Sequence, residues 1–130
     1  MIEEYHFGSI TIDGKTYNHD VEVRWAPLQK FGGGQAGEVL KWWRRESHII
    51  DVEDVKRAIE QNPETIVIGT GYSGVAEVTE FAQKEIQAKG IKLIIDLTEQ
   101  AVKTFNIINE ESLEEEGEQN KVIGFFHLTC

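Results

Sequence analysis

Alternating hydrophobic and polar positions predict that the N-terminal third of the chain is β-structure. The segment 5–12 is rich in β-branched and aromatic residues, Asp13-Gly14 is typical of a two-residue hairpin turn, and the segment 15–18 is expected to return as the second strand. In the segment 21–25 apolar and charged residues alternate with the period of a strand that has one buried face. The segment 39–45 fits a strand or a short helix, and its adjacent tryptophans favour the strand.

Beyond Asp51 the apolar residues recur at helical spacing in three segments, which alternate with short apolar runs. The first helix is expected to begin after Asp51, which can cap it, the second at Val75, and the third at Thr98, which can also act as a cap. Gly90 suits the left-handed position just past the second helix. The runs typical of buried strands are 66–68, 91–95 and 122–128.

This alternation of strands and helices predicts an α/β fold. Strands joined by helices pair in parallel through right-handed crossovers, whereas the hairpin in the N-terminal third is antiparallel. The length of 130 residues fits one domain. We therefore expect a single domain over residues 1–130 with a mixed β-sheet, a C-terminal βαβαβ core and an N-terminal antiparallel β-hairpin region. The direction of the last strand stays open.

The acidic balance of the chain argues against nucleic acid as a partner. Lys and Arg number 13 against 23 Asp and Glu, a net charge of -10, and phosphate binding needs concentrated basic side chains. Six of the glutamates lie within 110–118, where like-charge repulsion favours a solvated loop, with a further turn of helix as the alternative. No apolar stretch has the length of a membrane span or a signal peptide, so the expected location is cytoplasmic.

Histidine and cysteine do not form a pattern typical of a metal site. Cys130 is the single cysteine, so no intramolecular disulfide can form. His127 lies three residues before it, and on a strand such side chains point to opposite faces. The other candidates lack ligand spacing and are expected to be surface or hydrogen-bonded groups: His6, His19, Asp20 and His48. We therefore predict no metal and no cofactor.

A glycine-rich turn follows the predicted strand at 66–68. Its Gly-x-Gly-x-x-Gly pattern precedes a predicted helix, where backbone N–H groups and the helix dipole favour an anion. The ligand-binding candidates are Gly69, Thr70, Gly71, Tyr72, Ser73 and Gly74, with Arg44 and His48 as polar neighbours. The alternative is that the glycines only permit a tight turn and close helix packing. A dinucleotide site with Asp96 on the ribose is disfavoured, because the chain is too short for two nucleotide-binding halves.

Three further polar residues occur in the chain order of an α/β-hydrolase triad. Ser73, Asp96 and His127 would lie near the carboxyl ends of successive strands if the last strand is parallel. The Gly-x-Ser-x-Gly elbow is missing, because Ser73 is followed at once by Gly74. We therefore name no catalytic residue and expect a binding protein in preference to an enzyme.

The aromatic and cationic residues are most concentrated at one point of the chain. Trp42, Trp43, Arg44 and Arg45 are consecutive, and adjacent side chains on a strand point to opposite faces, so one tryptophan is expected in the core and the other exposed. Exposed Trp and Arg supply much of the binding energy at protein interfaces. These four residues are therefore the interaction candidates, with a core tryptophan and carboxylate-paired arginines as the alternative.

Several of these motifs in combination resemble a known family. The matching segments are Trp43-Arg44 with His48, Ile66 to Gly71, Thr98 to Lys103 with Phe105-Asn106, and Phe126 to Cys130. In this order they resemble the adipogenesis-associated Mth domain family, a domain of unknown function whose relatives include a mitochondrial complex I assembly factor. The resemblance implies a single three-layer α/β domain with a mixed sheet and no established reaction. Gly69 and Gly71 match the family pattern, whereas Gly74 and Asp96 are not general features of it.

Two hypotheses for the function follow. The first is a cytoplasmic interaction or assembly-type domain without established catalytic activity, which binds a protein partner, neither nucleic acid nor membrane, and exists as a monomer or weak dimer. The alternative is a binding protein or enzyme for a phosphate, nucleotide or other small anion, which uses the Gly69 to Gly74 turn.

Overall fold

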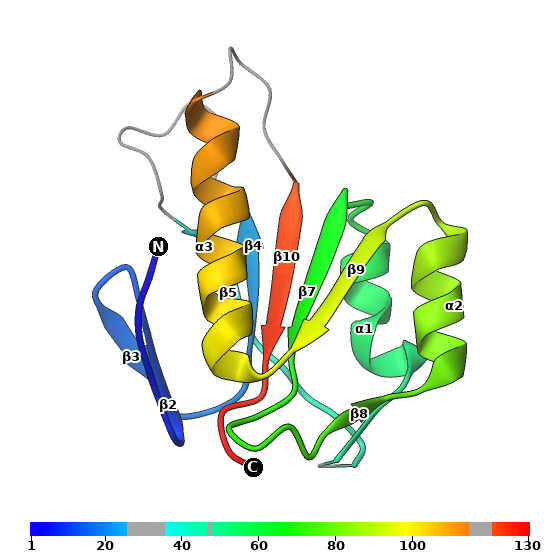
Figure 1. The fold of residues 1–130 in the computed structure, drawn as a ribbon, viewed down its shortest axis with the longest axis horizontal. Helices are drawn as coiled ribbons and strands as arrows, with labels where there is room; N and C mark the ends of the chain where they lie inside the picture. Colours follow the sequence, from blue (N-terminus) through cyan, green and yellow to red (C-terminus); the bar gives the residue numbers. More distant parts are fainter. Residues whose placement is uncertain (26–35, 47, 115–120) are drawn as a thin grey trace.

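A mixed β-sheet of five strands forms the centre of the molecule (Figure 1). The structure is a computed structural model and describes residues 1–25, 36–46, 48–114 and 121–130. The strands in spatial order are β5 (Ala36–Lys41), β4 (Val21–Trp25), β10 (Val122–Phe126), β7 (Thr65–Gly69) and β9 (Lys92–Asp96). β10, β7 and β9 are parallel, whereas β4 is antiparallel to both of its neighbours. The predicted βαβαβ core is thus confirmed, and the last strand is parallel to β7.

The N-terminal residues form a separate antiparallel sheet of three strands. They are β1 (Ile2–His6), β2 (Ser9–Ile12) and β3 (Lys15–Tyr17). The turn at Asp13-Gly14 is confirmed, with positive φ at both residues. The prediction of one strand over 5–12 is wrong, because Gly8 takes a φ of +84° and reverses the chain between β1 and β2. The segment that fitted strand or helix begins as a strand, since β5 extends to Lys41.

The first helix begins where the sequence predicted. α1 (Val52–Ile59) is capped by Asp51, whose carboxylate accepts the Val52 N–H at 2.8 Å and shares a capping box with Asp54.

The second helix starts later than predicted. α2 (Glu80–Ala88) is capped by the Thr79 hydroxyl and is followed by Gly90 with φ +77°. The expected start at Val75 is wrong, because Glu77 and Val78 form a short strand, β8, beside β6 (Ile49–Ile50). The N–H groups of Glu77 and Thr79 therefore donate to the carbonyls of His48 and Ile50 and not within a helix.

The third helix, α3 (Thr98–Glu114), starts at Thr98 but is not capped by its side chain. The Thr98 hydroxyl donates to the His127 carbonyl at 2.7 Å and accepts the Gly71 N–H at 2.8 Å. The helix continues to Glu114. The prediction of a solvated loop over 110–118 is therefore wrong for residues 110–114, where the alternative, a further turn of helix, is confirmed. Residues 115–118 lie outside the described residues.

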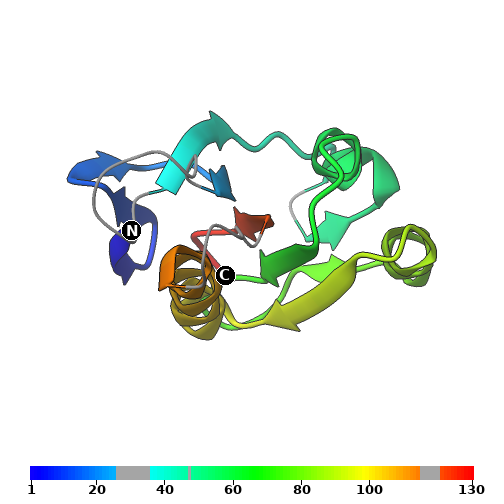
Figure 2. The same ribbon diagram turned by 90° about the horizontal axis from the view of Figure 1, so that it is seen from above.

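The layers follow from the alternation of side chains along the central strands. Ile66 and Ile68 of β7 face one side of the sheet and pack with α1 and α2, whereas Val67 faces the other side and packs with α3. The three-stranded sheet covers the remainder of the α3 side, as Figure 2 shows. The fold is therefore an α/β architecture with helices on both faces of a mixed sheet. No helix in the described ranges is long and apolar enough to cross a membrane.

Candidate functional site

One rung of hydrogen-bonded partners crosses the whole central sheet and defines an edge of the molecule. The rung consists of Lys41, Val21, Phe126, Gly69 and Asp96. Four of these residues end their strands and Val21 begins β4, so the chain leaves or enters all five strands at this level. We call the segments directly beyond this rung the carboxyl edge. In open α/β sheets this edge is where ligands and partners are commonly bound.

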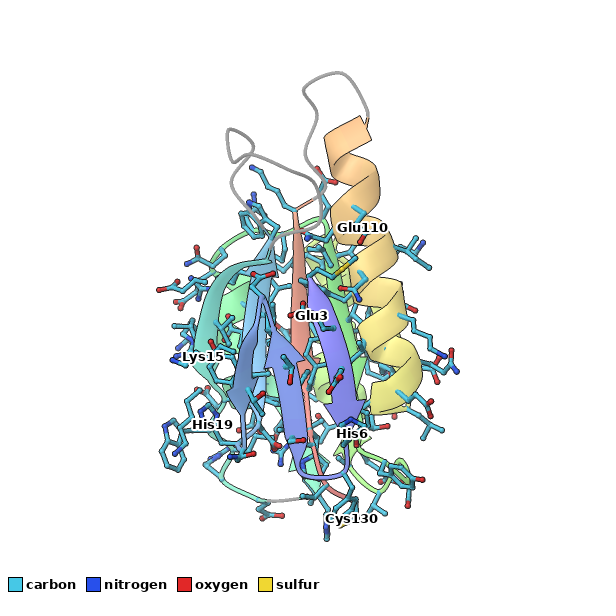
Figure 3. The ribbon with its side chains drawn as sticks, turned by 90° about the vertical axis from the view of Figure 1, so that its left-hand side faces the viewer. Glu3, His6, Lys15, His19, Glu110 and Cys130 are labelled. Carbon is cyan, nitrogen blue, oxygen red and sulfur yellow. The ribbon has the colours of Figure 1, made fainter. Side chains whose placement is uncertain are left out.

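The carboxyl edge collects almost every segment that the sequence singled out. Beyond β5 lie residues 42–46, beyond β7 the glycine-rich turn, beyond β9 Leu97 and Thr98, and beyond β10 residues 127–130. Asp20 joins them because β4 runs in the opposite direction. Figure 1 shows these segments below the sheet, and Figure 3 places Cys130, His6 and His19 at the same end, far from Glu110. The topology therefore brings the two candidate groups, the turn and the Trp-Arg segment, to one side of the fold.

Asp20 is the centre of a buried polar cluster at this edge. Its Oδ2 accepts hydrogen bonds from Arg44 Nη2 and from His127 Nδ1, both at 2.8 Å, and its Oδ1 accepts the Leu128 N–H at 2.8 Å. The Arg44 side chain is 6% exposed. One carboxylate thus links the segments at the ends of β4, β5 and β10.

The charges in the cluster decide where the protons lie. Nδ1 of His127 lies 2.8 Å from Asp20 Oδ2 and 3.0 Å from Arg44 Nη2, and it acts as a donor toward the carboxylate in the tautomer that carries its hydrogen on Nδ1. Burial alone raises the pKa of Asp20, but the hydrogen bonds from His127 and Leu128 and the positive charge of Arg44 outweigh it, so the pKa lies below its usual value. Burial lowers the pKa of Arg44, and Asp20 and Asp54 offset part of that shift. The cluster therefore holds an ionised carboxylate against a guanidinium that stays charged.

Arg44 has unused hydrogen-bonding capacity. Its Nε and Nη1 are buried and have no hydrogen-bond partner within the described part of the chain. The guanidinium lies 4.6 Å from the centre of the Trp42 ring, whose Nε1–H donates to the Asp54 carbonyl at 2.8 Å. A buried donor without a partner costs about 1–3 kcal/mol. These two nitrogens can therefore hold an oxygen acceptor, such as a buried water or a carboxylate.

The two tryptophans divide as the sequence predicted. Trp42 is buried in the core beside Phe125, with ring centres 4.8 Å apart, whereas Trp43 is exposed. Lys41 covers the exposed ring, with its Nζ 4.2 Å from the centre of Trp43. Arg44 binds inward to Asp20, and Arg45 remains exposed. Of the four interaction candidates, Trp43 and Arg45 are thus available to a partner.

The chain's own residues 128–130 occupy the N–H groups of the glycine-rich turn. Tyr72 N–H donates to the Thr129 carbonyl at 2.7 Å, and Val75 N–H donates to the Cys130 carbonyl at 3.0 Å. Two further N–H groups of the turn donate to Asp96 and Thr98. These four donors are satisfied inside the fold, and the helix that was expected to follow the turn directly begins only at Glu80.

Gly71 is the residue that lets these segments approach. Its φ is +111°, and a Cβ at this position would lie 2.6 Å from the carbonyl carbon and oxygen of Cys130. No other residue type fits both the conformation and the space. At Gly71 the glycine pattern thus serves close backbone packing, which was the alternative interpretation of the turn.

Tyr5 fixes the same segment from the N-terminal sheet. Its hydroxyl donates to the Leu128 carbonyl at 2.9 Å, and the Gly8 N–H donates to the same carbonyl at 2.8 Å. Burial raises the pKa of Tyr5 to about 12, and negative charge from neighbouring acids adds to that shift. Residues 128–130 are therefore held by three separate parts of the chain.

The structure does not assemble the hydrolase-type triad. His127 pairs with Asp20 and not with Asp96, whose Oδ1 accepts the N–H of Leu97, and Ser73 is exposed. His48 Nε2 lies 3.6 Å from the Cys130 sulfur. In the ranges that the structure covers, no group of three His, Cys, Asp or Glu side chains could hold a metal ion.

Exposed apolar side chains gather around residues 128–130. Phe7 and Tyr72 are 60% and 59% exposed, and their rings meet edge to face with centres 6.0 Å apart. Val75 and Leu97 are also exposed, and Leu97 packs against Gly74 of the turn. Exposed apolar clusters of this kind are typical of protein interaction sites. We call the four exposed residues, Phe7, Tyr72, Val75 and Leu97, the apolar patch.

Sequence reasoning missed Asp20 and Phe7 as parts of this site. Asp20 was expected to be a surface or hydrogen-bonded group, and only the position of β4 beside β10 brings it to His127. Phe7 was expected inside a strand, and the turn at Gly8 exposes it. A signal for Phe7 was available in the following glycine, but the side-chain partners of Asp20 lie in distant parts of the chain.

A comparison with protein families identifies the family of the chain. A family described as "Protein of unknown function (DUF498/DUF598)" matches residues 2–127. The chain belongs to the DUF498/DUF598 family. The match covers every strand and helix described above, so the family's shared unit is this whole fold.

Solved structures show the same fold. A conserved hypothetical protein, PH1505, from Pyrococcus horikoshii is 23% identical, with a TM-score of 0.75 over 100% of this chain and 99% of that chain. A protein from Bartonella henselae called an outer membrane protein is 18% identical, with a TM-score of 0.73 over 99% and 94% of the two chains. A protein from Bordetella parapertussis is 19% identical, with a TM-score of 0.69 over 100% and 95%. At these identities the likeness shows the fold alone.

Proposed function

We propose that this protein is an interaction or assembly-type domain that binds a partner protein through the apolar patch at its carboxyl edge. The observation that carries the proposal is the exposure of Phe7, Tyr72, Val75 and Leu97 on three segments, which the Phe7–Tyr72 ring contact and the close approach of Leu97 to Gly74 connect. Burying such side chains against a partner contributes about 25 cal/mol per Å² of apolar surface. A resemblance to the Mth domain family, with its assembly-factor relative, supports the same role by analogy.

The patch is held in place before a partner binds. The backbone of residues 128–130 accepts hydrogen bonds from Gly8, Tyr72 and Val75, each of which adjoins or belongs to the patch. The Leu128 N–H is anchored in turn to Asp20. A rigid surface loses little conformational entropy on binding, so more of the contact energy appears as affinity.

The charged residues around the patch indicate the chemistry of the partner. Glu77, Asp96 and Glu99 are exposed and lie close to Val75 or Leu97 in the chain. Opposite charges at the rim of an interface speed and orient association. We therefore expect a partner with an apolar centre and a basic rim, and we expect the contact to take place in the cytoplasm.

The hydrogen bonds of the turn argue against the alternative function, anion binding by the Gly69 to Gly74 turn. The N–H groups of Thr70, Gly71, Tyr72 and Val75 donate to acceptors of the chain itself. An anion would have to displace residues 128–130 to reach two of them. For this reason we do not propose this alternative.

Co-purification with a surface variant tests the proposal. The tagged full chain is recovered from the source cells as wild type, as the double variant Phe7→Ser with Tyr72→Ser, and as the control Ile107→Ser. Ile107 is similarly exposed, at 56%, but lies on α3 away from the patch. We expect the same partner with the wild type and the control and a loss of about tenfold or more with the double variant.

Equal recovery of the partner with all three chains would contradict the proposed surface. The circular dichroism spectrum of each variant checks that the fold is unchanged. Recovery of the protein with membranes, and not in the soluble cytoplasmic fraction of the same cells, would contradict the expected location.

A further inference from the structure

Among the residues that the structure describes, the outer side of β9 is an unpaired strand edge. β9 lies at the end of the strand order, and no described strand pairs with its outer side. Figure 1 shows α2 beside β9, and Figure 2 shows α2 displaced to the α1 side of the sheet, so no described strand continues the sheet beyond β9. Ile95 in this strand is 38% exposed. Such an edge presents unpaired backbone groups that can accept another strand.

The hydrogen bonds to β7 and its flanking residues show which backbone groups point outward. Lys92 N–H donates to the Glu64 carbonyl, and the Asp96 carbonyl accepts from Thr70, so the backbone groups of Lys92 and Asp96 face β7. Backbone groups alternate along a strand, and those of Ile94 therefore face β7 as well. The N–H and C=O groups of Leu93 and Ile95 point away from the sheet.

From this edge we infer that two copies of the chain pair antiparallel through β9, with Ile94 on the two-fold axis. Leu93 of one copy then lies opposite Ile95 of the other, and both residues exchange their outward N–H···O bonds with the partner strand. An interface of this kind is self-complementary, as a two-fold dimer requires. The central sheet then continues from one copy into the next.

The charges at the ends of β9 select this register. Lys92 begins the strand and Asp96 ends it, so the antiparallel arrangement places Lys92 of each copy opposite Asp96 of the other. A shift of two residues would also align outward backbone groups, but it would leave one of the charges opposite Ile94. A lone lysine on an edge strand commonly blocks pairing, whereas here the aspartate four residues later matches it.

The apolar side chains of β9 also find equivalent partners. Leu93 packs with the α1 and α2 side of the sheet and Ile94 with the α3 side. In the dimer Leu93 would meet Ile95 of the second copy on one face, and the two Ile94 side chains would meet on the other. Cross-strand apolar pairs of this kind stabilise antiparallel sheets. This interface does not include Phe7 or Tyr72, which are the residues changed in the co-purification test, although it shares Asp96 with the rim of the proposed partner surface.

Charge reversal at the two ends of β9 tests the inference. The mass of the full-length protein in solution is measured by light scattering and sedimentation over a range of concentrations. We expect a weak dimer for the wild type and a dissociation constant raised about tenfold or more for Lys92→Glu and for Asp96→Lys, because each variant places like charges opposite each other twice.

Mixing the two variants gives the decisive measurement. In a heterodimer the two substituted side chains would carry opposite charges and face each other, and the unchanged Asp96 of one chain would face the unchanged Lys92 of the other. We therefore expect the equal mixture of Lys92→Glu and Asp96→Lys to dimerise at least as well as the wild type. Charge reversal at an exposed site elsewhere, Lys84→Glu on α2, should leave dimerisation unchanged. A wild type that stays monomeric at every concentration, or a mixture no more dimeric than its components, would overturn the inference.

Discussion

At the scale of single residues, Asp20 is the side chain on which the carboxyl edge depends. It accepts hydrogen bonds from Arg44, His127 and the Leu128 backbone. Replacing it removes the common acceptor of two nearly buried side chains. Removing one partner from a buried ion pair is costly because the other charge remains in a medium of low polarity.

We therefore predict that Asp20→Asn lowers the free energy of unfolding by about 3 kcal/mol at neutral pH. The folded state holds the pKa of Asp20 below its ordinary value, so the stabilisation is present above that ordinary pKa of about 4 and is lost as the pH falls through the lowered one. The difference between wild type and variant in urea unfolding should thus shrink in acid. Glu38→Gln, at the exposed partner of Arg24, is the control and should change stability by about 0.5 kcal/mol or less. A difference that stays constant down to about pH 2 would contradict the assignment.

Tyr5 offers a second prediction, at the alkaline end. Its pKa is raised to about 12, so the folded state favours the neutral phenol, whose contribution is complete below about pH 10 and is lost as the pH rises toward 12. Tyr5→Phe should cost about 1 kcal/mol near neutral pH, through the lost bond to the Leu128 carbonyl, and less at about pH 11. Urea unfolding at both pH values measures the two free energies. Tyr17→Phe is the control and should cost less near neutral pH, because the Tyr17 hydroxyl makes no hydrogen bond to any residue that the structure describes.

At the scale of elements, the glycine-rich turn and residues 128–130 act as one unit. Their backbones are joined by the hydrogen bonds from Tyr72 and Val75, and Gly71 is the point of closest approach. The turn therefore packs closely against residues 128–130, and glycine makes this close packing possible. The strands it connects to, β7 and β10, are neighbours in the sheet, which is why their continuations meet.

Alanine substitution separates the two requirements on Gly71. Gly71→Ala introduces both an unfavourable φ and a clash with the Cys130 backbone, and we expect a loss of about 3 kcal/mol or more in the free energy of unfolding. Gly90→Ala, also at positive φ but with no atom within 4 Å of the added Cβ, should lose about 1 kcal/mol. Chemical denaturation of both variants measures the difference. Equal losses would mean that the close approach at Gly71 has no energetic consequence.

At the scale of the whole molecule, the strand order explains why the site lies at one edge. β4 enters the sheet beside β10 in the opposite direction, and β5 follows it back, so the start of β4 and the ends of β5, β10, β7 and β9 coincide. The Asp20 cluster, the turn and the apolar patch are thus neighbours. No described strand pairs with the outer side of β9, which lies at the end of the sheet.

The sequence by itself determined those features that depend on neighbours along the chain. The period of apolar residues identified the strands β7, β9 and β10, and Asp51 identified the start of α1 through a capping interaction within one turn. The expectation that all three strands are buried holds for β7 and β10 but is wrong for β9, whose residues are half-buried or exposed at the end of the sheet. Trp42 and Trp43 divide between core and surface as predicted, although β5 ends at Lys41 and neither tryptophan lies in a strand. Local rules suffice for such features, because the energies that decide them act over a few residues.

Only the tertiary structure decided which distant segments meet. The start of α2 moved from Val75 to Glu80 because β8 pairs with β6, and the Thr98 hydroxyl bonds to Gly71 and His127 and not to its own helix. Asp20 joined Arg44 and His127 because of the strand order. These outcomes depend on hydrogen bonds and burial between residues far apart in the chain. No local pattern records such contacts, since their free energy exists only once the sheet has formed.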